Sequence, residues 1–200
     1  MNPKIEKLIK QFAKLPRVGN RAARRMVLGL LQDKTGRMDK LIDALNDARN
    51  NIRPCPVCGV LTDTSAPVCE FCSKPERANG ILCLVRDLAD VWTLEKSGVF
   101  GGRYHILGGL LSGVSGVTPE DLNLSGLHNR IVNEKITEII FALPNTIEGK
   151  TTQQYIMSIV NDVVDNVQFT ELASGVPLGG DIDYLDDGTL TLAFGGRKKI

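Results

Sequence analysis

Apolar residues in the first part of the chain recur at the spacing of amphipathic helices. Pro3 suits the first turn of a helix, and the apolar stripe that follows it in the sequence consists of Ile5, Leu8, Ile9 and Phe12. A second stripe follows the helix-breaking stretch 15–20, and it consists of Ala22, Ala23, Met26, Val27, Leu30 and Leu31. A third helix is expected over residues 38–51, and its expected inward residues are Leu41, Ile42 and Leu45. These patterns predict a small helical domain.

Beyond residue 80 the pattern changes to short apolar strands that alternate with helices. The continuous apolar run Ile81–Val85 is typical of a parallel strand that is covered on both faces. Further strands are expected over residues 103–107, 136–143 and 167–172, and helices over residues 87–96, 127–135 and 150–164. This alternation predicts an α/β domain with a parallel sheet flanked by helices, whose functional loops follow the carboxyl ends of the strands.

Two Cys-x-x-Cys pairs lie between these regions, and they consist of Cys55, Cys58, Cys69 and Cys72. Four closely spaced thiolates suit a tetrahedral zinc ion, and four protein ligands leave no open position for a substrate, so one structural zinc per chain is expected. A disulfide framework, a redox Cys-x-x-Cys and an iron site are the alternatives. The fifth cysteine, Cys83, lies in an apolar run and is expected to be a buried thiol.

Composition describes an ordinary globular protein. The chain has 200 residues, of which 42% are hydrophobic and 24% charged, enough to bury a core. Its N-terminus lacks the apolar core of a signal peptide, and no apolar run approaches the roughly 20 residues that cross a bilayer. We therefore expect a cytoplasmic protein without membrane contact, in which reduced thiols disfavour disulfides.

Charge is distributed unevenly along the chain. Residues 1–53 hold 13 Lys and Arg against 5 Asp and Glu, a net charge of +8, whereas the remainder carries −7. The basic segment includes an arginine cluster around the break between the first two helices, formed by Arg17, Arg21, Arg24 and Arg25. Free amides and arginines at a helix start form a cradle for phosphate, so these four are the candidate DNA-binding residues. The alternatives are a solvated helix surface and a helical hairpin that only builds a core.

The sequence Leu-Pro-Arg-Val-Gly over residues 15–19 resembles the Leu-Pro-Gly-x-Gly turn of a helix-hairpin-helix, which binds the DNA backbone without sequence preference. Segments 84–95, 102–109 and 145–149 are similar to the Toprim domain of the RecR family of recombination mediators, and segment 176–184 is similar to its C-terminal, Walker B-like tail. The order of modules matches that family along nearly the whole chain. The resemblance implies a helix-hairpin-helix domain over 1–53, a zinc module over 54–77, a Toprim domain over 78–172 and a C-terminal extension over 173–200.

The resemblance also implies a function. A RecR-like protein binds DNA, docks RecO-like and RecF-like proteins, promotes RecA loading on gapped DNA, associates with the nucleoid and forms a homo-oligomer, either a dimer or a ring tetramer. Acidic residues at the carboxyl ends of the strands are the candidate partner-docking residues, namely Asp87, Asp90 and Glu148. Capping of helix N-termini is the structural alternative for these carboxylates.

Several departures argue against an enzyme. Toprim nucleases and topoisomerases place a Glu after the first strand and an Asp-x-Asp after the third, because phosphate-bound Mg²⁺ needs clustered oxygen ligands. Here Arg86 follows the first strand, residues 144–146 read Pro-Asn-Thr where the family has Asn-Pro-Thr, and no Asp-x-Asp directly follows the third strand. The chain also lacks a Gly-x-x-x-x-Gly-Lys-Ser/Thr loop for nucleotides. His105 and His128 have no catalytic motif beside them and are expected to be structural. A metal-dependent Toprim enzyme and a zinc-stabilised scaffold without a DNA role are the rival functions.

Overall fold

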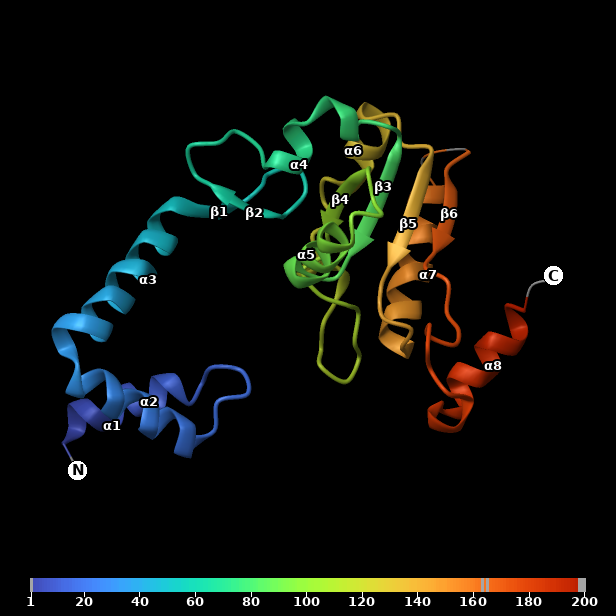
Figure 1. Ribbon diagram of the computed structural model, residues 1–200. Coiled ribbons are helices and arrows are strands. Elements are labelled where there is room, and N and C mark those ends of the chain that lie inside the picture. Colours follow the sequence, from blue (N-terminus) through green and yellow to red (C-terminus); the bar gives the residue numbers. More distant parts are fainter. Residues whose placement is uncertain (1, 163, 165, 198–200) are drawn as a thin grey trace. The chain divides into compact units, whose positions relative to one another are not determined.

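A computed structural model of the chain describes residues 2–162, 164 and 166–197 (Figure 1). The chain forms two compact units. The helical unit comprises Met1–Ile52 and Asp63–Ser65, and the sheet unit comprises Arg53–Thr62 and Ala66–Ile200. Every helix in the described part of the chain is too short or too polar for a membrane-spanning segment.

The helical unit contains α1 (Pro3–Phe12), α2 (Asn20–Gln32), the short π-helical turn η1 (Lys34–Met38) and α3 (Asp39–Asn51). Asn2 caps α1 by accepting a hydrogen bond from the Lys4 amide at 2.9 Å, which satisfies one of the free donors at the helix start. The small core of the unit consists of Ile9, Ala23 and Val27. The first two helices therefore form where the apolar spacing predicted them.

The third helix differs from its prediction. Leu41, Ile42 and Leu45 are 37%, 45% and 61% exposed, so the expectation that they point inward is wrong for the single chain. Met26, which belongs to the apolar stripe predicted for α2, is also 47% exposed. Helical periodicity shows which residues share a face, but it does not show what covers that face. Two helices of this unit thus present apolar side chains to solvent.

The remaining elements belong to the sheet unit, except that Ile52 at the start of the first strand and Asp63 at the end of the second strand belong to the helical unit. Their order is β1 (Ile52–Pro54), β2 (Leu61–Asp63), α4 (Glu70–Ser73), η2 (Pro75–Arg77), β3 (Ile81–Val85), α5 (Leu88–Ser97), β4 (Arg103–Ile106), η3 (Pro119–Asp121), α6 (Leu127–Asn133), β5 (Glu138–Ala142), α7 (Ile147–Asn161), β6 (Gln168–Glu171), η4 (Ile182–Tyr184) and α8 (Asp187–Gly195). The bounds of β3 are those expected from the sequence. Helix α7 begins three residues earlier than expected, and residue 163 of the predicted 150–164 helix lies outside the described residues.

Four parallel strands form the main sheet in the order β4-β3-β5-β6, which confirms the predicted architecture (Figure 1). The sheet is covered on both faces, as the continuous apolar run of β3 predicted. Leu82 and Leu84 of β3 pack in one cluster with α6 and α7. Cys83 and Val85 point the other way and pack in a second cluster with α5 and the cysteine pairs. The cysteine segment thereby becomes part of the sheet unit's core.

The early start of α7 has a local cause. The Thr146 side chain accepts a hydrogen bond from the Gly149 amide at 3.2 Å and so caps the helix. A Cβ atom at position 149 would lie 1.9 Å from the carbonyl oxygen of Pro144, so only glycine fits there. The turn after β5 is therefore fixed by the Thr146 cap and by Gly149, and hydrophobic periodicity does not predict either feature.

Candidate functional site: a four-cysteine cluster, a basic helix and an acidic sheet edge

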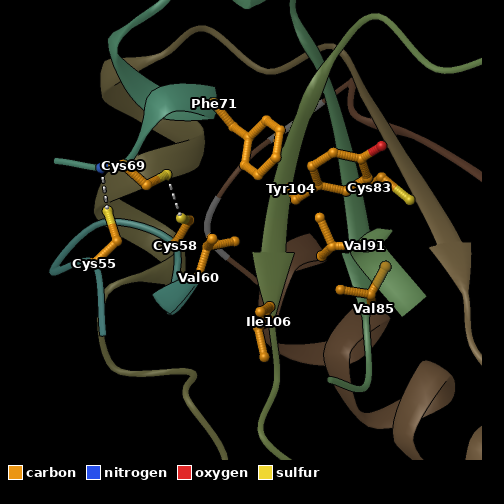
Figure 2. Close-up of a cluster of buried hydrophobic side chains, with 10 residues drawn as sticks. All are labelled: Cys55, Cys58, Val60, Cys69, Phe71, Cys83, Val85, Val91, Tyr104 and Ile106. Carbon is orange, nitrogen blue, oxygen red and sulfur yellow. Dashed lines mark hydrogen bonds between the residues drawn. The ribbon is translucent and has the colours of Figure 1, made fainter. Parts of the chain in front are cut away.

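The structure brings the four predicted cysteines together. Cys55 and Cys58 lie in the turn after β1, whereas Cys69 is the N-cap of the short helix α4 and Cys72 lies within that helix. All four sulfurs lie within 4.8 Å of one another. Figure 2 shows three of these cysteines, and the sulfurs of Cys58 and Cys69 are 3.3 Å apart. This separation is far longer than the roughly 2.05 Å of a disulfide bond. The group has the size and donor chemistry of a metal site.

Backbone hydrogen bonds shape the first cysteine turn. The Gly59 amide donates to the carbonyl oxygen of Cys55 at 2.9 Å, and the Cys55 amide donates to that of Val60 at 2.8 Å. Gly59 has a φ of +81°, and a Cβ atom there would lie 3.0 Å from Asn123 and 3.3 Å from Ile106. Glycine is therefore required both by the left-handed backbone and by the close approach of the sheet unit's own loops.

The four sulfurs suit a metal cation that prefers soft ligands. Hydrogen bonds with the sulfurs of Cys69 and Cys72 raise the pKa of Cys58, because the neutral thiol is the better partner for a neighbouring thiolate. Four thiols this close cannot all ionise without a counter-charge, and a divalent metal supplies one. Cys83 stands apart from the group, and burial raises its pKa to about 12, as expected of an inert thiol.

The cysteine turns cover one face of the sheet. Three of the cysteines share a buried cluster with Phe71 and Tyr104, whose rings meet edge to face at 5.5 Å between centroids (Figure 2). The Ile106 amide at the end of β4 donates to the carbonyl oxygen of Cys58 at 2.8 Å. Ordering of the cysteine segment is therefore coupled to packing of the sheet.

The hairpin between α1 and α2 has the backbone of its motif despite the changed residue. Arg17 occupies the first glycine position and adopts a left-handed φ of +62°, which explains why glycine is usual there. Helix α2 begins at Asn20, and its N-cap residue Gly19 has no side chain that could accept a hydrogen bond from the first amides of the helix. Such a helix start can accept a phosphate group.

The structure divides the predicted arginine cluster. Arg21 and Arg24 line a groove between α1 and α2, together with Lys10, which was not among the predicted site residues. Glu6 also lines this groove, so three cations face one carboxylate there. Arg25 instead borders a second hollow beside Met26 and Leu41. Lys10 lies on α1, and only the packing of two helices places it beside the arginines of α2. The basic groove is thus larger than the sequence cluster suggested.

The acidic residues occupy the carboxyl ends of β3 and β5, which are neighbouring parallel strands. Asp87 caps α5 by accepting from the amides of Ala89 at 2.9 Å and Asp90 at 3.3 Å, and Asp90 accepts from the Asp87 amide at 3.2 Å. Glu148 lies in the first turn of α7. Two of the three carboxylates therefore have a capping role in the fold.

Arg86 pairs with this acidic group. Its Nε atom lies 2.9 Å from Oδ2 of Asp87. Partial burial opposes ionisation of Asp87, yet the bonds from Arg86 and the α5 amides outweigh it and lower the pKa of that carboxyl. The residue that stands where Toprim enzymes have a metal-binding Glu thus neutralises an adjacent carboxylate.

Comparisons with known proteins match the chain from end to end. Family models described as "RecR, helix-hairpin-helix", "Toprim domain" and "RecR, C-terminal" match residues 5–49, 80–171 and 175–198. The recombination protein RecR of Rhodospirillum rubrum is 48% identical over 196 residues, which cover 98% of both chains. Those of Maricaulis maris and Paracoccus denitrificans are 47% and 46% identical, with 99% and 98% of this chain covered and 96% of each relative.

Proposed function

The chain belongs to the RecR family of recombination proteins, and from this premise we propose that it is a non-enzymatic mediator of recombinational DNA repair. In this proposal it binds DNA without sequence preference and acts with RecO-like and RecF-like proteins to promote RecA loading on gapped DNA. Residues 1–53 bind DNA, 54–77 hold zinc, 78–172 dock partners, and 173–200 extend the C-terminus. The observation that carries the proposal is the full-length match combined with a basic groove at the hairpin.

DNA contact is assigned to the start of α2. Arg17, Arg21, Arg24 and Arg25 lie at or beside the hairpin, Lys10 joins Arg21 and Arg24 in the groove, and the uncapped helix start offers amides to phosphate. Guanidinium groups, an ammonium group and helix amides all bind phosphate oxygens, and such contacts position the DNA backbone without carrying sequence information.

Changing Arg21 and Arg25 together to Ala is expected to weaken DNA binding and to flatten its salt dependence. Each lost phosphate contact removes about one released counterion, so the log-log slope of affinity against salt should fall by roughly two on duplex DNA. The matched control is Lys34→Ala with Lys40→Ala, which removes the same charge from exposed sites of the helical unit. Fluorescence anisotropy over a salt series measures both slopes. A folded arginine variant with the wild-type slope would move the DNA site elsewhere.

One structural zinc ion per chain is assigned to the four cysteines. The donor set, four buried or half-buried sulfurs within 4.8 Å, suits zinc and leaves no ligand position for a reacting water. The proposed role is to complete the core that covers one face of the sheet.

The proposal excludes Toprim-type cleavage, because Arg86 places a cation where a Mg²⁺ ligand is needed. Arg86→Glu is expected to leave the protein without Mg²⁺-dependent nicking of supercoiled DNA, and to strengthen docking of RecO-like protein by freeing Asp87 and adding negative charge. Arg86→Gln removes the cation without adding a carboxylate, so it separates the effect of freeing Asp87 from the effect of the added negative charge. Gel assays of nicking and titration with the purified partner are the measurements. Nicking that disappears on Glu148→Gln would favour the nuclease instead.

Self-association is the last part of the proposal. Apolar side chains on α2 and α3 remain exposed in the single chain, the largest exposed fraction being 61% at Leu45. Exposed stripes of this kind commonly meet a second copy, and several weak DNA sites in one particle bind far more tightly than one. We therefore assign these helices, with the C-terminal region, to a homo-oligomer of dimer or ring-tetramer form.

A further inference from the structure

Arg130 on α6 is a buried cation whose position the function above does not use. It is 5% exposed. Its guanidinium donates through Nη1 to the Tyr104 carbonyl oxygen at 2.6 Å, pairs through Nε with Glu134 at 3.0 Å, and places Nη2 4.0 Å from the Cys72 sulfur. Arginine is almost never buried to this degree without compensating partners, so each of these contacts requires an explanation.

The local ion pairs leave positive charge uncompensated. Glu134 is paired through its other oxygen with Arg103, at 2.9 Å from Nη1, so two arginines share one carboxylate. Arg103 also donates to the Cys72 carbonyl oxygen at 3.1 Å. Both guanidinium groups therefore converge on the backbone or the sulfur of the same cysteine.

The neighbouring histidine, His105, adds no charge to this group. His105 is buried, and its Nε2–H donates to the Asn123 carbonyl oxygen at 2.6 Å. Its Nδ1 is then the unprotonated nitrogen, and it lies 3.3 Å from Nη1 of Arg130, which can only donate. The imidazole is thus neutral, and the excess positive charge faces the cysteine cluster.

A zinc ion held by four thiolates carries the opposite excess. Four thiolates carry more negative charge than Zn²⁺ carries positive charge, and the surplus negative charge resides on the sulfurs. A guanidinium buried against one of those sulfurs offsets it in surroundings where water cannot. The two groups that would each be unstable alone therefore compensate one another.

We propose that Arg130 is the outer-shell partner of Cys72 in the metal centre, a positioning residue whose charge and hydrogen bond hold that ligand and raise zinc affinity. The inference rests on the proposed zinc. The same guanidinium is hydrogen-bonded to Tyr104 and His105 of β4, the strand at the edge of the sheet. One side chain of α6 therefore connects the metal centre with the position of that strand.

The test compares zinc affinity, by chelator competition, in full-length variants. Arg130→Met is expected to weaken zinc binding 10- to 100-fold, the usual cost of losing an outer-shell partner. Arg130→Lys is expected to weaken it less, because the ammonium keeps the charge but not the planar set of donors. The matched control is Arg77→Met, which removes a guanidinium ion-paired with Glu95 at 2.7 Å and stacked on Phe71 in the same core.

A second readout separates contact with the sulfur from general stability. In protein loaded with cadmium, the ¹¹³Cd resonance is expected to move in both Arg130 variants and to stay in place in Arg77→Met. Equal loss of zinc affinity in Arg130→Met and Arg77→Met, or a folded Arg130→Met with wild-type affinity, would overturn the role of Arg130. If Arg130→Met does not fold, Arg130→Lys against Arg77→Met decides. Wild-type protein that binds no zinc would instead overturn the metal centre itself.

Discussion

Replacing Cys58 by Ser is expected to release the metal and to destabilise the whole sheet unit. Binding at structural zinc sites contributes on the order of 10 kcal/mol, and a hydroxyl is a poor substitute for a thiolate. The effect should extend beyond the cysteine turns, because Cys58 bonds to Ile106 of β4 and shares a core with Phe71 and Tyr104. Elemental analysis under reducing conditions measures the loss of metal, and thermal unfolding with and without a chelator measures the loss of stability.

Cys83→Ser is the matched control for this experiment. Cys83 is also buried in the same cluster, but it stands outside the four-sulfur group. This variant should keep one zinc per chain and lose only the stability that comes with a polar atom in an apolar core, about 1–3 kcal/mol. A wild-type protein without zinc, or a Cys58→Ser protein with full metal content and stability, would refute the metal assignment.

Changing Ile42 and Leu45 together to Asp is expected to dissociate the oligomer and thereby to weaken DNA binding by about 10²- to 10⁴-fold. Charges on the proposed contact face cannot be buried against a second copy, and the separated subunits lose the gain from several linked sites. The single chain should stay folded, because both side chains are already exposed in it. Sedimentation equilibrium at micromolar concentration measures the mass, and anisotropy measures binding to long DNA.

Val99→Asp with Val114→Asp is the control, since these residues are 79% and 98% exposed in the sheet unit. It should keep the wild-type mass and DNA affinity. If the wild-type assembly is a closed ring, it should also remain on circular DNA through a high-salt wash and leave once the circle is cut. Equal retention on circular and linear DNA would exclude encirclement, and a monomeric wild-type protein would exclude the oligomer.

Several features were determined by the sequence itself, because each depends on residues close together in the chain. The stripe that begins at Ile5 predicted α1, and the uninterrupted run Ile81–Val85 predicted a central strand of a parallel sheet. The spacing of the two cysteine pairs predicted a cluster that the structure brings within 4.8 Å. The motif order also identified the family that the comparisons found. Local spacing suffices where a hydrogen-bonded turn or a helical repeat sets the geometry.

Other features were decided only by tertiary structure. The periodicity of α3 showed that Leu41 and Leu45 share a face, but only the packing of the helices showed that the single chain leaves this face exposed. Arg25 was grouped with Arg21 by helical spacing, yet the groove at Arg21 is completed by Lys10 from another helix. Arg130 reaches the sulfur of Cys72 across 58 residues of sequence. Such contacts depend on the path of the chain, because the free energy of burying a charge or an apolar face depends on what lies opposite it, and neighbouring residues do not specify that.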